Sequence, residues 1–243
     1  MSSNKTRLRF LPCGDSAVTV EFSKEMSEQV NRQIRYVASA LTEGGVKGIS
    51  ECVPTFCSLT VYYDPFQISA KKIQRKIESV MASYRETAGQ TKRVFMIPVC
   101  YQGEHAPDLA DVCALTGLTK EEVIKIHTGT DYLIYMLGFL PGFPYLGGMD
   151  KRIEAPRLDS PRTTIPVGAV GIGGKQTGIY PLASPGGWRL IGRTPVKVYD
   201  PDREEPIVYR AGDYIRFYAI TEEEFAAIAA TGGSVIEMRE ETT

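Results

Sequence analysis

The chain has 243 residues, of which 43% are hydrophobic and 23% are charged. This composition is typical of a globular protein and excludes an intrinsically disordered chain. The formal net charge of −1 and the pI near 6.2 exclude the strong basic field with which proteins hold a phosphate backbone, so we expect no nucleic acid partner.

The N-terminal segment MSSNKTRLRF is basic, but Cys13, Gly14 and Asp15 follow it where a secretory signal has an apolar core of about 7–15 residues. We therefore expect a cytoplasmic protein. Its five cysteines lie outside any C-x-x-C motif and are expected to be thiols that act as small buried hydrophobic residues. The uncharged segment from Tyr132 to Met149 holds several prolines and glycines, which predicts an irregular segment of a soluble protein and no membrane span.

The first 88 residues alternate strands and helices. Ala17–Phe22 predicts a strand, and apolar residues between Val30 and Leu41 recur at helical spacing. The pattern returns as a strand at Cys57–Tyr63 and a helical stripe from Ile73 to Tyr84. Two amphipathic helices suit one face of an antiparallel sheet, so we expect a small α+β domain over residues 1–88.

The polar run from Arg85 to Arg93 is the best linker candidate. A second domain, residues 89–243, then starts with a strand at Val94–Tyr101 and a short helix at Asp108–Leu115. A further helix begins at a capping box formed by Thr119 and Glu122.

Glycine and proline are concentrated in the middle of this second domain, which leaves room only for short strands and shaped loops. Strands are expected at Val196–Tyr199, Ile207–Arg210 and Tyr214–Tyr218, before a last helix with a Thr221/Glu224 capping box. Many short strands at this spacing predict a β-barrel.

The stretch GAVGIGGKQTG, Gly168 to Gly178, invites comparison with phosphate-binding loops. It fails the Walker pattern, because Gln176 follows Lys175 where a Ser or Thr is needed, and it lacks the third glycine of the dinucleotide fingerprint. Two interpretations stay open: a loop that offers Lys175, Gln176 and Thr177 to a ligand, or a tight corner of the barrel.

Other motifs give no support to DNA binding or to a metal site. Residues 108–127 have the layout of a helix-turn-helix, but Glu121 and Glu122 balance the lysines of the second helix and would repel phosphates. The spacing of Cys100, His105, Cys113 and His127 matches no common zinc site. We therefore expect no metal bound by this chain.

Several side chains suit a binding face. Phe139, Phe143 and Tyr145 either fill the barrel or line a cleft, and Trp188 is either a ring platform or a barrel plug. His127, at a helix end, is a candidate for capping or for proton transfer.

Arg157 and Arg162 stand in proline-rich loops. They are either solvated or hold a carboxylate or phosphate, which a planar guanidinium binds with two hydrogen bonds.

These same segments resemble a known family. The runs that carry the resemblance are GFLPGFPYLGG from Gly138, APR at Ala155–Arg157, SPR at Ser160–Arg162, and IPVGAVGIGGKQTGIYPLASPGGWRLIGRTP from Ile165 to Pro195. They are similar to the 5-oxoprolinase B-subunit family, also called the KipI family, which is related to allophanate hydrolase subunit 1. Gly14–Ala17 is similar to the opening motif of that family, so the match spans most of the chain.

The resemblance implies an N-terminal α+β domain followed by a cyclophilin-like β-barrel domain. It also implies a non-autonomous hydrolase component that works with the C and A subunits of 5-oxoprolinase and uses ATP with Mg²⁺ to open 5-oxo-L-proline to L-glutamate. ATP has a chemical role there, because a lactam is a poor electrophile until its oxygen is phosphorylated. No motif here can cradle a triphosphate, so a partner is expected to complete the ATP site. Kinship with cyclophilins does not imply prolyl isomerase activity.

Two alternatives remain. Some members of the family are described as inhibitors of a sporulation sensor histidine kinase, which would make the chain a regulatory binding protein. A carboxyltransferase role, like that of related urea-degrading enzymes, would need a biotin-bearing partner.

The predicted working face is directed at the substrate or at the C subunit. Its arginines would hold an anion, and Gln176 and Thr177 would bond a lactam. Trp188 or Phe143 would form a flat apolar wall against the lactam ring. The face comprises Phe139, Phe143, Tyr145, Arg157, Arg162, Gln176, Thr177 and Trp188.

Overall fold

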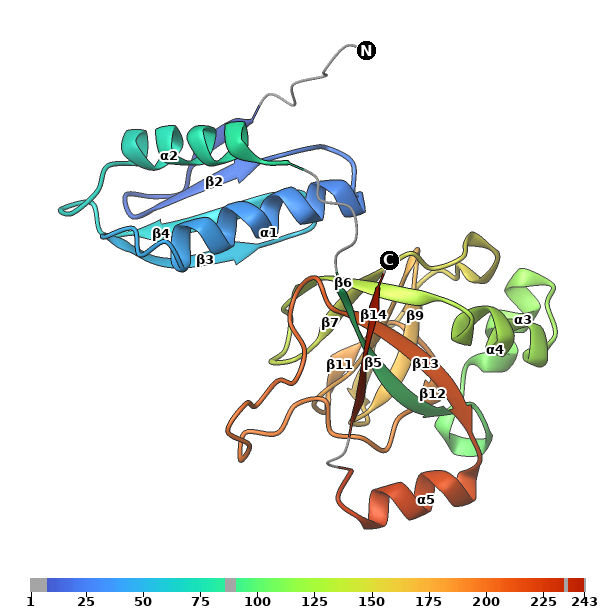
Figure 1. Cartoon of the computed structure of the whole chain (residues 1–243). Helices are drawn as coiled ribbons and strands as arrows, with labels where there is room; N and C mark the ends of the chain where they lie inside the picture. Colours follow the sequence, from blue (N-terminus) through green and yellow to red (C-terminus); the bar gives the residue numbers. More distant parts are fainter. Residues whose placement is uncertain (1–7, 86–90, 234–235, 243) are drawn as a thin grey trace. The chain divides into compact units, whose positions relative to one another are not determined.

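The computed structural model describes residues 8–85, 91–233 and 236–242 (Figure 1). The chain divides into two units, residues 1–88 and 89–243, which we describe separately. Residues 1–7, in the basic N-terminal segment, and 86–90, in the predicted linker, lie outside the described residues.

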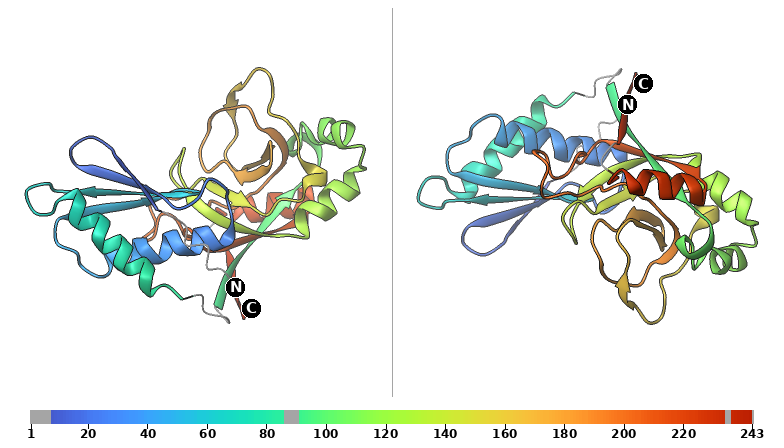
Figure 2. Two further views of the ribbon diagram at one scale, coloured as in Figure 1. Left: turned by 90° about the horizontal axis from the view of Figure 1, so that it is seen from above. Right: turned by 90° about the horizontal axis from the view of Figure 1, so that it is seen from below.

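The first unit contains a four-stranded antiparallel sheet and two helices. In chain order its elements are β1 (Arg9–Pro12), β2 (Ala17–Glu21), α1 (Glu28–Thr42), β3 (Ile49–Pro54), β4 (Ser58–Tyr63) and α2 (Ala70–Ser83). The strands pair in the order β1-β2-β4-β3, and both helices cover one face of this sheet (Figure 2).

The predicted helical stripes of the first unit are confirmed. Ser27 and Ser69 precede the two helices, and each side chain accepts a hydrogen bond from a backbone N–H of the first turn. Each buried apolar side chain contributes about 1.5–3 kcal/mol to folding. Those turned towards the sheet are Ile34, Val37, Leu41, Ile73, Ile77 and Val80.

The second unit is built around a closed β-barrel, which confirms the barrel prediction. The strands of its main sheet are β5 (Thr91–Cys100), β6 (Asp131–Leu137), β7 (Pro144–Gly147), β9 (Ala169–Gly173), β10 (Gln176–Ile179), β12 (Arg189–Arg193), β13 (Tyr214–Ile220) and β14 (Glu237–Thr242). Seven of them form the ring β12-β9-β10-β7-β6-β13-β5, and β12 returns to β5 through Arg193 and Cys100. The last strand, β14, pairs with the other end of β5.

Smaller elements surround the barrel. They are a 3₁₀ turn at Gly103–His105, α3 (Leu109–Thr116), α4 (Lys120–Thr128), a 3₁₀ turn at Lys151–Ile153, β8 (Arg162–Ile165), β11 (Ser184–Gly186) and α5 (Glu222–Ala230). The capping boxes of Thr119 with Glu122 and of Thr221 with Glu224 are both present, as predicted.

The predicted strands at Val196–Tyr199 and Ile207–Arg210 are wrong. Only one isolated bridge, between Tyr199 and Ile207, joins the two segments. Their apolar alternation reflects burial, because Val198 and its neighbours pack into the barrel core without a continuous ladder. Alternation alone therefore did not distinguish a strand from a buried loop.

Two further predictions need correction. The segment from Tyr132 to Met149 is not irregular throughout, since it supplies most of β6 and all of β7. Among the described residues no helix is long and apolar enough to cross a membrane. All five cysteines are free thiols, but the expectation that they are buried holds only for Cys100. Cys13 is exposed, and Cys52, Cys57 and Cys113 are partly exposed.

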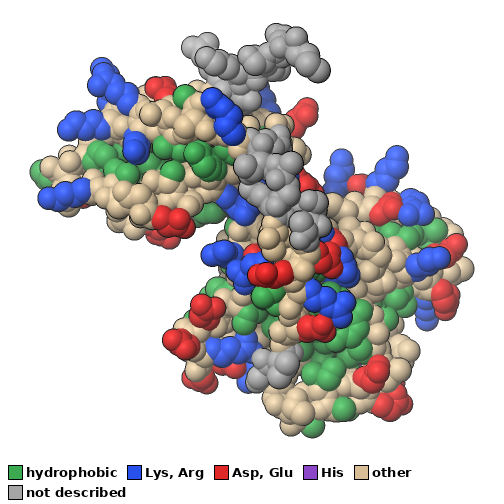
Figure 3. All heavy atoms as spheres, viewed as in Figure 1, with side chains coloured by type: hydrophobic (Ala, Val, Ile, Leu, Met, Phe, Trp, Pro, Cys, Tyr) green, Lys and Arg blue, Asp and Glu red, His purple; other side chains and the backbone are tan. Residues whose placement is uncertain are grey.

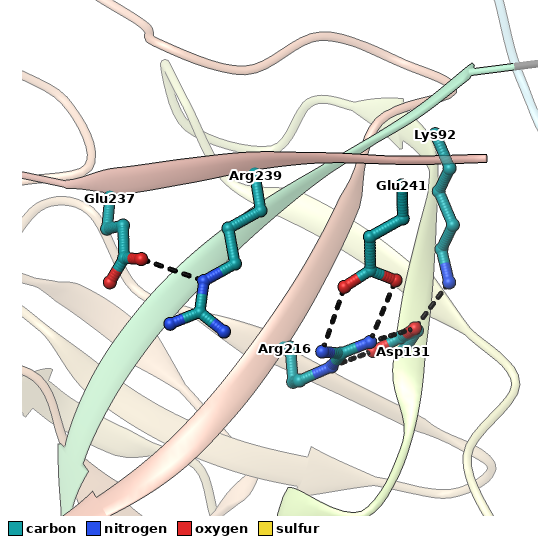
Figure 4. Close-up of polar contacts among 6 residues, drawn as sticks. All are labelled: Lys92, Asp131, Arg216, Glu237, Arg239 and Glu241. Atoms are coloured by element: carbon teal, nitrogen blue, oxygen red, sulfur yellow. Dashed lines mark hydrogen bonds and ion pairs between the residues drawn. The ribbon is translucent and has the colours of Figure 1, made fainter.

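A cluster of charges joins four strands at one end of the barrel unit (Figure 4). Asp131 of β6 accepts hydrogen bonds from Arg216 of β13 and Lys92 of β5. Arg216 also donates to the two carboxylate oxygens of Glu241 in β14, at 3.1 and 3.2 Å. Burial raises the pKa of Asp131, but the hydrogen bonds from Arg216 and Lys92 outweigh this effect and hold it below its ordinary value.

We expect Asp131→Asn to lower the free energy of unfolding at pH 7 by about 1–3 kcal/mol, because Arg216 and Lys92 lose their charged acceptor. A depressed carboxylate pKa stabilises the fold above a pH of about 4, and this contribution is lost as the pH falls through the folded-state pKa. Urea unfolding at several pH values should therefore show a shallower acid loss in the variant than in the wild type.

The matched control for this experiment is Glu237→Gln, since Glu237 forms an exposed pair with Arg239 in the same strand (Figure 4). Exposed pairs contribute little, so its acid loss should match that of the wild type. Equal acid losses in the Asp131 variant and the wild type would contradict the prediction.

Gly192 lies in β12, where this strand approaches β5 to close the barrel. We expect Gly192→Ala to lower the free energy of unfolding by about 1–3 kcal/mol through overpacking. A Cβ there would lie 2.5 Å from the Cγ1 of Val99 and 3.1 Å from the carbonyl oxygen of Cys100. Gly138→Ala is the control, because its Cβ would meet nothing closer than 3.5 Å. Urea unfolding followed by the fluorescence of Trp188, the single tryptophan, measures both, and equal midpoints would refute the prediction.

Candidate functional site

An aromatic cluster separate from the main barrel core forms the centre of the candidate site. Phe143, Tyr180 and Trp188 pack edge to face, with ring centroids 5.3 Å apart for Phe143 and Tyr180 and 5.6 Å apart for Phe143 and Trp188. Edge-to-face contacts place the positive edge of one ring against the negative face of another. The predicted rings Phe143 and Trp188 therefore lie together, and Tyr180 is a third member that the sequence did not single out.

Phe139 stands at the exposed edge of this cluster. It is 61% exposed, and its ring centroid lies 5.6 Å from that of Phe143. Among the described residues it is the only one other than glycine with a positive φ, 64°. A residue other than glycine with a positive φ has a strained backbone, and such strain persists only where the surrounding structure holds it. Strained residues of this kind are concentrated at functional sites. The turn is held by hydrogen bonds from Leu140 N–H to Gly138 O, at 2.7 Å, and from Phe143 N–H to Leu140 O, at 3.0 Å.

Exposure divides the predicted rings into two groups. Phe143 and Trp188 are 2% and 5% exposed, so they support the site from beneath. Phe139 is exposed and Tyr145 is partly exposed, so a ligand would meet these two rings first. The apolar wall predicted for Phe143 or Trp188 is therefore not accessible, and the rings that are exposed beside the cluster are Phe139 and Tyr145.

The glycines between Gly168 and Gly178 make room for the cluster. A Cβ on Gly173 would lie 2.4 Å from the indole nitrogen of Trp188, and one on Gly178 would lie 3.1 Å from both Phe143 and Trp188. These glycines lie in the hairpin of β9 and β10. Because they have no side chain, the indole ring of Trp188 packs directly on the backbone of the hairpin. Their small size is thus explained by packing and requires no phosphate.

The polar residues of this hairpin point to different places. Lys175 is exposed at the turn and Gln176 is partly exposed, so both are accessible. Thr177 is fully buried, and its hydroxyl donates to the carbonyl of Gly171 at 3.1 Å. Thr177 therefore faces the barrel interior and leaves the predicted working face.

The two predicted arginines have different surroundings. Arg157 is exposed, and its guanidinium carbon lies 5.9 Å from the centroid of the Trp188 ring, within the range of a cation–π contact. Arg162 is partly buried and donates to the carboxylate of Asp108 at 2.6 Å. Asp108 is 4% exposed and also accepts the N–H of Leu190 at 2.6 Å.

Asp108 is a positioning residue that sequence reasoning missed. It occupies the N-cap position of α3, yet its side chain makes no capping hydrogen bond, because both oxygens are engaged by Arg162 and Leu190. In the sequence, Asp108 stands at the start of a predicted helix, a position that suggests helix capping. Nothing in the sequence indicates that it pairs with Arg162, 54 residues further along the chain.

Tyr180 lies within electrostatic reach of both arginines. Burial raises its pKa to about 12, while a hydrogen bond from the Trp188 backbone and the charges of Arg157 and Arg162 act in the opposite direction. The hydroxyl therefore stays protonated near neutral pH. Tyr180 is only 2% exposed, so it supports the site from beneath, as Phe143 and Trp188 do.

His127 lies in the main barrel core and has no access to this face. It is fully buried, its Nδ1 lies 2.7 Å from the hydroxyl of Tyr101, and its Nε2 lies 2.9 Å from that of Thr177. Since the Thr177 proton goes to Gly171, Nε2–H donates to Thr177 and Nδ1 accepts from Tyr101. Burial lowers the pKa of His127 to about 3, so the ring stays neutral at ordinary pH, and its geometry suits a structural role better than the predicted proton transfer.

The described residues contain no group of three or more His, Cys, Asp or Glu that could hold a metal ion. On the face drawn in Figure 3, acidic and basic side chains are interspersed over the barrel unit. The candidate site thus offers aromatic surface, two arginines, an amide and a phenol. Such a set can bind and orient an anionic ligand, but it contains no evident nucleophile.

Comparison with known proteins gives the family. The family described as carboxyltransferase domain, subdomain C and D, matches residues 8–209. The 5-oxoprolinase B-subunit of Bacillus subtilis is 45% identical over 224 residues, which cover 88% of this chain and 93% of that protein. The protein of the same name from Escherichia coli O157:H7 is 39% identical over 212 residues, with 87% and 95% covered.

Solved structures agree with this assignment. A conserved uncharacterized protein of Pyrococcus horikoshii is 41% identical, with 89% of this chain and all of that chain covered and a TM-score of 0.53. A longer solved chain is 38% identical to this one, with a TM-score of 0.74. The match covers 84% of this chain and 40% of the longer one.

The urea carboxylase of Kluyveromyces lactis, 21% identical, covers 97% of this chain, which spans 24% of that enzyme, with a TM-score of 0.78. At that level of identity the likeness concerns the fold alone. The family match and the 45% identity over nearly the whole length of a relative confirm what the sequence motifs predicted: the chain belongs to the 5-oxoprolinase B-subunit family.

Proposed function

We propose that this chain is the B-subunit of an ATP-dependent 5-oxoprolinase, which with the C and A subunits activates 5-oxo-L-proline for ring opening to L-glutamate. The observation that carries the proposal is the side of the barrel where Arg157 and the strained Phe139 border the cluster of Phe143, Tyr180 and Trp188. Relatives that bear the name of this 5-oxoprolinase component align with nearly the whole chain and support it. Their name also implies partner subunits.

The substrate has two features that this face suits. Its carboxylate calls for a cation, and Arg157 is exposed beside the aromatic cluster. Its flat lactam ring suits the accessible rings of Phe139 and Tyr145, and Gln176 could bond the amide. In this proposal the chain holds and orients the lactam while its oxygen is phosphorylated.

Another component of the enzyme would complete the ATP site. Mg²⁺ is usually held by one or two carboxylates together with the phosphates, and the residues of the predicted working face include no Asp or Glu. The glycine-rich hairpin is filled by Trp188 and leaves no cradle for a triphosphate. Because the proposed activity consumes ATP, we expect it in the cytoplasm.

The purified chain alone should therefore release no ADP in the presence of 5-oxo-L-proline, whereas the chain combined with the C and A subunits should. The measurement is coupled ADP release for this chain alone, with the C subunit, and with both partners. Substrate-stimulated ADP release by the isolated chain would overturn the assignment of the ATP site to a partner.

Arg157→Ala should depress the coupled activity by roughly 10- to 150-fold, the effect of losing a charged hydrogen bond that the bound substrate and partner subunits shield from water. Arg157 makes no ion pair among the described residues, so the variant should fold normally. Arg162→Ala is less suitable, because it leaves the buried Asp108 without its partner.

Lys175→Ala is the matched control, since it removes an exposed cation from the neighbouring hairpin turn. It should turn over like the wild type. If the Arg157 variant assembles with its partners and shows wild-type activity, this face does not hold the substrate carboxylate.

A further inference from the structure

A second feature lies beyond the aromatic cluster in the same unit. A cavity of about 310 Å³ is bounded by the 3₁₀ turn at Gly103–His105 and by residues of β8 and β12. Its polar walls include His105, Arg162, Arg193 and Glu104. Its volume is at the lower end of small-molecule sites, which commonly measure about 300–1,000 Å³.

Two nitrogens on its walls lack partners. The Nη1 of Arg162 and the Nδ1 of His105 are both buried and have no hydrogen-bond partner within the described part of the chain. Arg162 uses its Nη2 for Asp108, so the same guanidinium group is anchored at one end and unsatisfied at the other. Buried polar atoms in folded proteins are nearly always paired, so both nitrogens indicate a missing partner. For Arg162 Nη1, which can only donate, that partner is an acceptor.

The side chains on the cavity walls are held in place by contacts within the chain. The Nε of Arg193 donates to the carbonyl of Val167 at 2.9 Å, and its guanidinium carbon lies 5.8 Å from the ring centroid of Phe225. The ring of His105 packs on the same phenylalanine, with centroids 4.1 Å apart. Side chains fixed in this way lose little conformational freedom on binding, so the site is preorganised.

The charge balance selects the ligand. Asp108 already compensates Arg162, which leaves Arg193 as the additional cation, and Glu104 adds a carboxylate of its own to the wall. A doubly charged phosphate would be poorly compensated here. Since Glu104 in turn offsets Arg193, the walls carry no net charge, and a carboxylate adds one negative charge where a phosphate adds two. A monoanionic carboxylate can accept from Arg162 Nη1 and from Arg193.

We propose that this cavity binds the carboxylate of a small organic acid, held between Arg162 and Arg193 with His105 beside it. The site itself does not depend on the function proposed above. That its ligand is a second molecule of 5-oxo-L-proline, bound apart from the one at Arg157, or another acid handled by the same enzyme, does rest on that function.

The test is a titration of the full-length ¹⁵N-labelled chain, observed by NMR, with propionate and with propionamide, which has a similar shape but no charge. Propionate should shift the amide signals of residues 104, 105, 164 and 193 in a saturable way, and propionamide should not. Arg193→Gln should weaken the binding of propionate roughly 10- to 150-fold, as expected for a lost charged contact. The control is Lys175→Gln, which removes an exposed cation outside the cavity. This variant should bind propionate as the wild type does.

Equal binding of propionate and propionamide, wild-type affinity in the Arg193 variant, or tighter binding of inorganic phosphate than of propionate would overturn the proposal. If Arg193→Gln fails to fold, His105→Phe keeps the ring against Phe225 and removes Nδ1, and weaker binding of propionate is again expected. A further titration compares 5-oxo-L-proline with 2-pyrrolidinone, the same ring without the carboxylate. Propionate binding without any preference for 5-oxo-L-proline leaves the site standing and contradicts only its link to the proposed function.

Discussion

The hydrogen bonds of the Asp108 carboxylate join the segments from which the candidate site and the cavity are built. One oxygen binds Arg162 at the start of β8 and the other binds the N–H of Leu190 in β12, while the backbone N–H of Asp108 donates to the carbonyl of the same leucine at 2.9 Å. A nearly buried carboxylate needs this complete set of donors, since breaking such a pair costs about 3–5 kcal/mol. The strand that follows Trp188, the anchored arginine and the start of α3 therefore hold their positions together.

The barrel unit separates its polar chemistry into two environments. The main core holds a neutral His127 whose two nitrogens are satisfied by Tyr101 and Thr177, so it fills space and orders the interior. The aromatic cluster lies apart from that core, with Phe139 exposed at its edge. A buried network that is fully satisfied rigidifies its surroundings, which suits a unit whose surface has to hold a strained loop.

Features set by neighbouring residues could be predicted from the sequence. Helical stripes and capping boxes depend on spacings of three or four residues, and both were located correctly. The pairing of Asp108 with Arg162 and the fit of Trp188 over Gly173 could not be predicted, because they bring together residues far apart in the chain. Without knowledge of these contacts, the glycine-rich stretch suggested a ligand-binding loop. In the structure its glycines make room for the ring of Trp188, which packs on them from the segment between β11 and β12.

The position of β14 has a consequence for the architecture of the barrel unit. Its register places Thr242 opposite Thr91, so the first and last strands of the unit pair with their ends side by side. The start of β5 and the end of β14 thus lie at the same edge of the barrel unit. A unit with adjacent ends can be added to another polypeptide, or inserted within one, as a self-contained cassette without disturbing the ring of strands.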